Sequence, residues 1–123
     1  MKHSHTLLLA ATGALSLLLA ACASTPPPTS EIAVSAAAVA HAAGAGAPAG
    51  APAEMRSARD KLARANLAMT NKDYAEARTL ALEATADAQL AEARTEAAKS
   101  RKAADEVAEA SRVLREEMAR KPK

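Results

Sequence analysis

The segment from residue 53 to residue 121 contains neither glycine nor proline, and this constrains the fold more than any other feature of the sequence. Alanine, glutamate, lysine, arginine and leucine dominate it, and these residues have the highest helix propensities. Pro52 and Glu54 suit a helix start, because proline lacks the N–H left unpaired there and an acidic side chain stabilises the positive end of the helix dipole. We therefore expect an all-α protein.

Apolar spacing within this segment predicts an αα-hairpin. The first helix, residues 53–70, has a seam with spacings of three and four residues: Met55, Ala58, Leu62, Ala65 and Met69. Asn71 tolerates a left-handed backbone, and Asp73 with Glu76 resembles a capping box that opens a second helix. Residues 73–119 then form a long C-terminal helix of about 70 Å. One unbroken helix over residues 53–119 is the alternative.

The first part of the long helix carries two apolar seams. One seam consists of Ala77, Ala81, Ala84, Ala88 and Ala91, and the other of Leu82, Ala86, Leu90 and Ala93. They lie about 160° apart at 100° per residue, so we expect neighbouring helices on both sides. Residues 53–70 and a short helix over residues 30–43 would supply these neighbours. The expected architecture is a small three-helix bundle.

Beyond Ala93 only the second seam continues, which predicts a coiled-coil-like distal part. Its members are Ala97, Ser100, Ala104, Val107, Ser111, Leu114 and Met118, and the opposite face carries charge pairs one helical turn apart. The other two helices are too short to cover this part. Val107, Leu114 and Met118 are therefore the candidate seam for a partner.

The short helix follows from a seam of Ile32, Ala36, Val39 and Ala43, with Ser30 as its expected N-cap. Glycine and proline between residues 44 and 52 should end it in irregular structure. The alternative is that residues 23–52 form a disordered linker.

The N-terminus reads as a targeting segment. Lys2 precedes an apolar run from Leu7 to Leu19, which is too short to span a bilayer and is typical of a signal peptide over residues 1–21. The sequence Leu19-Ala20-Ala21-Cys22 resembles the lipobox of bacterial lipoproteins, which implies cleavage between Ala21 and Cys22 and lipidation of Cys22. Residues 22–29 then form a proline-rich stalk, followed by the helical domain over residues 30–121. The resemblance implies attachment to the membrane through this lipid, and the lack of Asp at position 23 favours the periplasmic face of the outer membrane.

Composition argues against catalysis and nucleic-acid binding. After the signal segment only fifteen apolar side chains larger than alanine remain, whereas enzyme pockets are usually walled by bulky side chains. His41 is the one histidine of the mature chain, so no metal site or nucleophile-base pair is expected, nor any cofactor. Basic residues alternate with acidic ones, which disfavours nucleic acid. We expect no enzyme.

Several short stretches resemble one family. They are Ala51-Pro52-Ala53-Glu54-Met55, Ala58-Arg59-Asp60-Lys61-Leu62, Asp73-Tyr74-Ala75-Glu76-Ala77 and Ala86-Asp87-Ala88-Gln89-Leu90-Ala91. With the lipobox, they are similar to the alanine-rich bacterial lipoproteins known only as domain of unknown function 4398. The resemblance covers roughly residues 30–117 and implies a fold and a location, without an assigned chemistry.

Three functional hypotheses remain. The first is a structural or adaptor lipoprotein whose distal helix associates with itself or with another envelope protein. The second is a peptidoglycan tether through the C-terminal Lys123, by resemblance to a small outer-membrane lipoprotein of enteric bacteria. The third is a peptide-binding module, because the hairpin at Asp73 resembles a tetratricopeptide repeat, although at least three repeats are normally needed.

Overall fold

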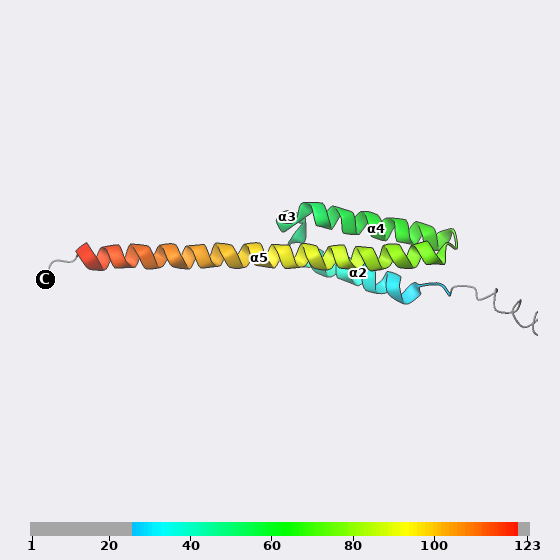
Figure 1. Cartoon of the computed structure of the whole chain (residues 1–123), viewed down its shortest axis with the longest axis horizontal. Helices are drawn as coiled ribbons and strands as arrows, with labels where there is room; N and C mark the ends of the chain where they lie inside the picture. Colours follow the sequence, from blue (N-terminus) through cyan, green and yellow to red (C-terminus); the bar gives the residue numbers. More distant parts are fainter. Residues whose placement is uncertain (1–25, 121–123) are drawn as a thin grey trace, which may run out of the picture.

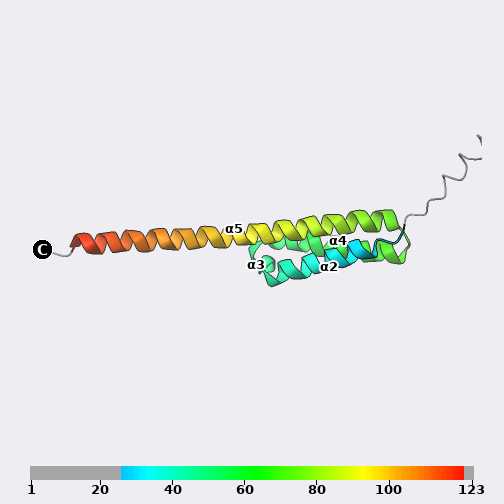
Figure 2. The same cartoon turned by 90° about the horizontal axis from the view of Figure 1, so that it is seen from below.

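The computed structural model describes residues 26–120, and this part of the chain consists of helices joined by short connections. In chain order they are α2 (Thr29–Gly44), α3 (Ala47–Gly50), α4 (Pro52–Thr70) and α5 (Tyr74–Arg120). α2 and α4 lie along the first half of α5, whose second half extends beyond them alone (Figures 1 and 2). Each of these three helices contacts the other two. The predicted all-α class, with a three-helix bundle and a long C-terminal helix, is confirmed for these residues.

The start of α2 differs from the prediction. The helix begins at Thr29, Pro28 stands at its N-cap position, and no side chain caps it, so the predicted capping role of Ser30 is wrong. The Ser30 hydroxyl instead donates a hydrogen bond to the Glu31 carboxylate, with 2.7 Å between Oγ and Oε2. Residues 29–44 are helical, so the alternative of a disordered linker is wrong for this segment.

The buried face of α2 is rotated from the predicted seam. Ser35, Val39 and Ala42 are buried, whereas the predicted Ala36 is exposed and Ala43 is only half-buried. Most of α2 is alanine, so its sequence offers several apolar faces of similar composition. Contact with α4 and α5 selects one of them.

The connection between α2 and α4 contains a short helix, although its glycines and prolines predict irregular structure. Gly46 has a φ of 89°, a left-handed value that favours glycine, and α3 follows it as one helical turn. A Cβ on Gly50 would lie 2.5 Å from Oγ1 of Thr95, a residue of α5. Gly50 therefore permits the close approach of α3 to α5.

The predicted hairpin between α4 and α5 is confirmed, but its left-handed residue is Lys72, with a φ of 63°, and not Asn71. The Asp73 N–H donates to the Ala68 carbonyl at 2.9 Å and the Lys72 N–H to the Met69 carbonyl at 3.1 Å. These two bonds form a Schellman motif, which requires the left-handed conformation at the residue after the C-cap. Because Asn71 is itself the C-cap, the left-handed position moves to Lys72.

Asp73 caps the start of α5 as predicted, but the capping box with Glu76 is incomplete, because the Asp73 N–H donates to the Ala68 carbonyl. The N–H of Glu76 donates to Oδ1 of Asp73 at 3.3 Å, which is the side-chain to backbone bond of an N-cap. This cap and the Schellman motif end one helix and begin the next within three residues. The unbroken helix over residues 53–119 is therefore excluded.

The core is a set of alanine contacts around one long side chain. Met55 is the largest fully buried side chain, and the rest of its cluster is small: Val39, Ala42, Ala47, Ala51, Ala58, Ala88 and Ala91. A second cluster joins Ala65, Leu80 and Ala81, with Ile32 packed against it. Alanine lets helix axes approach closely, so α2 and α4 fit together on one side of α5.

This packing corrects the expectation of neighbours on both sides of α5. The first predicted seam, from Ala77 to Ala91, is fully buried. The second is not covered by any described helix, and Leu82 and Leu90 are 57% and 44% exposed. The apolar pattern of α5 was read correctly, but only one of its two faces is used within the described chain.

Candidate functional site

The distal part of α5 lies outside the bundle. Thr95 is the last buried residue of the helix, and every residue from 96 to 120 is exposed. We call residues 96–120 the arm; at 1.5 Å per residue it is about 37 Å long (Figure 1). The three candidate seam residues Val107, Leu114 and Met118 lie on it and are 66%, 62% and 68% exposed.

The apolar stripe of the arm continues onto the bundle. We use the name α5 seam for this stripe of exposed residues, which consists of Leu82, Ala86, Leu90, Ala93, Ala97, Ser100, Ala104, Val107, Ser111, Leu114 and Met118. At 100° per residue these positions share one face of α5, opposite the buried alanines. Sequence reasoning assigned the first members to the bundle interior, so it treated only the distal part as a candidate surface. The structure joins both parts into one surface.

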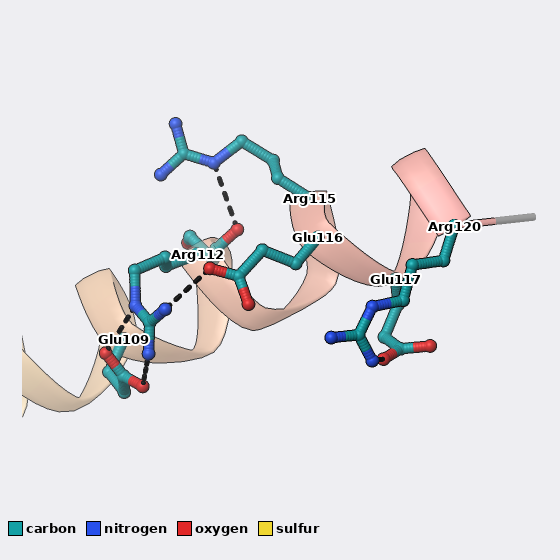
Figure 3. Close-up of polar contacts among 7 residues, drawn as sticks. Glu109, Arg112, Arg115, Glu116, Glu117 and Arg120 are labelled. Atoms are coloured by element: carbon teal, nitrogen blue, oxygen red, sulfur yellow. Dashed lines mark hydrogen bonds and ion pairs between the residues drawn. The ribbon is translucent and has the colours of Figure 1, made fainter.

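Charged side chains away from the α5 seam stabilise the arm by local ion pairs. The guanidinium of Arg112 lies 2.5 Å from Oε1 of Glu109 and 2.6 Å from Oε1 of Glu116 (Figure 3). The hydrogen bonds to Glu109, and next the one to Glu116, raise the pKa of Arg112. Arg120 pairs with Glu117 at 3.3 Å, and the Arg115 side chain donates to a backbone carbonyl. Such pairs stabilise an exposed helix by a few tenths of a kcal/mol each. They account for a helix that persists without tertiary contacts.

A family model matches residues 30–107, and its description is Domain of unknown function (DUF4398). The chain belongs to the DUF4398 family. This match covers α2, α3, α4 and the part of α5 up to Val107, and it includes every buried residue of the described chain except Pro28. No curated protein and no solved structure matches the chain. The DUF4398 match therefore defines a packed bundle and the beginning of the arm.

Ion pairs line both edges of the DUF4398 bundle where α2 and α4 meet α5. On the α2 side, Glu31 contacts Nε of Arg78 at 2.7 Å, and hydrogen bonds from Ser30 and Arg78 lower the pKa of Glu31 to about 2. His41 and Glu92 are 3.1 Å apart on the same side. These contacts join the ends of α2 to α5.

On the α4 side, Nζ of Lys61 lies 2.9 Å from Oδ2 of Asp87 and 3.3 Å from Oε2 of Glu83. The hydrogen bond to Asp87 raises the pKa of Lys61. Burial raises the pKa of Asp87, but hydrogen bonds from Ser57 and Lys61 outweigh burial and lower it overall. Glu54 pairs with the guanidinium of Arg94. The carboxylates at this edge are thus held by basic partners within the bundle.

Two hollows of the bundle surface are open and are lined by a mixture of small apolar and polar or charged residues. One of about 380 Å³ lies between α2 and α5 beside His41, and one of about 630 Å³ lies between α3 and α5 beside Lys99. The Lys99 ammonium donates a hydrogen bond to the Ala45 carbonyl there, with 2.9 Å between Nζ and the oxygen. Among residues 26–120, no three His, Cys, Asp or Glu side chains gather as metal ligands would.

Within the same range, no helix is long and apolar enough to cross a membrane.

The remaining predicted site residues lie outside the described range. They are Ala21 and Cys22 at the proposed cleavage and lipidation site, and Lys123 of the tether hypothesis. The signal segment over residues 1–21 and the first residues of the stalk lie outside it as well. The candidate surface that the structure describes is therefore the α5 seam.

Proposed function

We propose that this DUF4398 protein is a lipoprotein of the bacterial cell envelope with a structural or adaptor role. It is anchored through Cys22 at the periplasmic face of the outer membrane and acts by helix-helix association. The arm carries this proposal, because a helix of about 37 Å with an apolar stripe and no covering element in the described chain is suited to binding another helix.

The anchor is supported by the N-terminal sequence. The apolar run up to Leu19 leads directly to small residues and to Cys22, which is the single cysteine of the chain. A lipidated N-terminus with more than one acyl chain holds a protein stably on a membrane. The helices then stand beyond a short proline-rich stalk, so the arm extends away from the point of attachment.

Association through the arm is supported by the distribution of its large side chains. Leu114 and Met118 lie one turn apart on the α5 seam, and Val107 lies two turns before Leu114. Exposed apolar rows of this kind are the contact positions of coiled coils and of helix-in-groove complexes. The opposite face of the arm carries the Arg112 ion pairs and is suited to water.

Replacement of Cys22 tests the anchor. Wild-type protein should be found with the membrane fraction and should be released by detergent, whereas Cys22→Ser should remain uncleaved or become soluble in the periplasm. Metabolic labelling with a fatty acid should mark the wild type only. Wild-type protein recovered in the soluble fraction without label would refute the lipoprotein assignment.

Replacement of the arm side chains tests association. The triple variant Val107→Gln, Leu114→Gln and Met118→Gln keeps good helix formers at these positions and should retain its helicity while losing crosslinked species in envelopes. Val113→Gln is the matched control, because Val113 is 45% exposed on the arm but lies off the α5 seam. A triple variant that crosslinks like wild type would refute association through this surface.

A further inference from the structure

The α5 seam has the spacing of a regular two-stranded coiled coil over most of its length. From Ala86 to Met118 its positions alternate strictly by four and three residues. In heptad notation the a positions are Leu90, Ala97, Ala104, Ser111 and Met118, and the d positions are Ala86, Ala93, Ser100, Val107 and Leu114. The stretch spans 33 residues, or about 50 Å. It is longer than the arm, since its first three members lie beside the bundle.

The bundle leaves this row free to meet another helix. Ala88 and Thr95 lie at f positions, opposite the a and d positions. Ala88 is buried in the Met55 cluster, and Thr95 is buried next to Gly50 of α3. Leu90 on the open side is 44% exposed although it lies at the level of the bundle. A second helix can therefore follow α5 along the whole row without displacing α2 or α4.

From Arg94 onwards the charges that flank the row are segregated by sign, whereas the earlier e residue, Asp87, is acidic. The e positions on the α4 side include Arg94, Arg101 and Arg115. The g positions on the α2 side include Glu96 and Glu117, with Gln89 as the polar residue nearest the bundle. The other flanking positions on the arm are Ala103, Ala108 and Ala110, which allow close approach.

We propose that the α5 seam binds the same seam of a second copy of this chain, in parallel and in register. In a parallel coiled coil each g residue faces the e residue five positions later on the other helix, so Glu96 of each copy faces Arg101 of the other. Gln89 faces Arg94 in the same way. This arrangement yields two symmetric Glu96 to Arg101 pairs and no like-charge pair at the described positions.

An antiparallel pair is disfavoured by the same charges. In that arrangement e positions face e positions, and full overlap of the two rows brings Arg101 against Arg101. The acidic e residue Asp87 would face Arg115, but Asp87 is already bound by Lys61 at 2.9 Å and by Ser57 at 2.6 Å. The Asp87 side chain is only 23% exposed in this contact between α4 and α5, whereas Glu96 is 57% exposed and its contact with Lys99 lies within one helix. Glu96 is therefore the more available carboxylate, which favours the parallel pair.

This inference rests on the association proposed above, for which it names the partner and the geometry, but it does not depend on the lipid anchor. Two copies anchored in one membrane would also present their helices in parallel. The tests therefore use the full chain carrying Cys22→Ser, in mild detergent. An engineered cysteine is then its single thiol.

Single cysteines at two distant seam positions test the direction of pairing. Ala93→Cys and Ser111→Cys lie about 27 Å apart along α5, one beside the bundle and one on the arm. In a parallel, in-register pair each residue faces its own copy within disulfide reach, so mild oxidation should yield a disulfide-linked dimer for both variants. Ala98→Cys, which lies off the seam, is the matched control and should stay monomeric on a non-reducing gel.

Other outcomes overturn the inference in distinguishable ways. Crosslinking at only one of the two positions indicates an antiparallel pair, because only residues near its twofold axis face themselves. Crosslinking at neither position excludes the parallel, in-register pair. If a mixture of the two variants then forms a mixed disulfide, the pair is antiparallel, because full antiparallel overlap places Ala93 of one copy opposite Ser111 of the other; without that disulfide the seam does not bind itself. If photo-crosslinking from the seam in envelopes then captures only a different protein, self-association fails while the adaptor role proposed above stands.

A charge exchange tests the register. Glu96→Arg and Arg101→Glu should each raise the dimer dissociation constant about tenfold, because two attractive pairs become repulsive. The double variant should return it to within about threefold of wild type, as measured by analytical ultracentrifugation. Glu96 also contacts Lys99 within its own helix at 2.9 Å, a contact that the double variant does not restore. Recovery therefore reports pairing between copies, and a double variant as weak as the single ones would overturn the proposed register.

Discussion

Replacing Met55 with alanine tests whether the bundle depends on a single long side chain among small ones. Met55 is 1% exposed, and apart from Val39 the other members of its cluster are alanines. The substitution removes three heavy atoms beyond Cβ, which corresponds to about 2.4 kcal/mol of lost transfer free energy. Around Met55 only Val39 and the half-buried Leu62 have side-chain torsions with which to fill the void, so a cavity contribution adds to this loss. We expect a loss of about 3 to 4 kcal/mol in the free energy of unfolding.

Urea unfolding monitored by circular dichroism measures this loss. Leu67→Ala is the matched control, because Leu67 lies on the same helix, α4, but is 62% exposed, and its truncation should change stability by less than about 0.5 kcal/mol. The folded baselines should show that both variants retain the helicity of wild type. A loss below about 1 kcal/mol for Met55→Ala, or equal losses in the two variants, would refute the assignment of the core.

Three further predictions concern the connections and edges of the bundle. In the same urea assay, Gly50→Ala should lower the free energy of unfolding by about 1 to 3 kcal/mol, because the new Cβ would lie 2.5 Å from Oγ1 of Thr95. Gly44→Ala is the control: no described atom lies within 4 Å of its new Cβ, so it should be neutral or slightly stabilising. Asp73→Ala should cost about 1 kcal/mol in thermal melts, the usual effect of losing an N-cap; no change would show that the hairpin does not need it. Glu31 has a folded pKa of about 2 against 4.5, so its ionised form stabilises the fold above pH 4.5 and this stabilisation is lost as the pH falls towards 2. Glu31→Gln should flatten that part of the curve of thermal midpoint against pH, and an unchanged curve would contradict the ion pair with Arg78.

Helix content and helix breaks were predictable from the sequence because they depend on local free energies. The run without glycine or proline, the Asp73 cap and the spacing of Met55, Ala58 and Ala65 specify helices and a hairpin without reference to distant residues. The alternating spacing of three and four residues from Ala86 to Met118 was also predictable from the sequence. The neighbour of that seam was not predictable, because periodicity identifies an apolar face but not what packs against it.

Tertiary structure decided which apolar faces are used. Alanine occurs on nearly every side of α2 and on two sides of α5, so the sequence of each helix is compatible with several packings of similar local free energy. The alanines of α5 from Ala77 to Ala91 let α2 and α4 approach closely on one side, and the side with Leu82 and Leu90 is left exposed. In α2 the same mutual fit buries Ser35 and leaves Ala36 exposed. Burial depends on the shapes of all three helices together, so it is determined only when they pack.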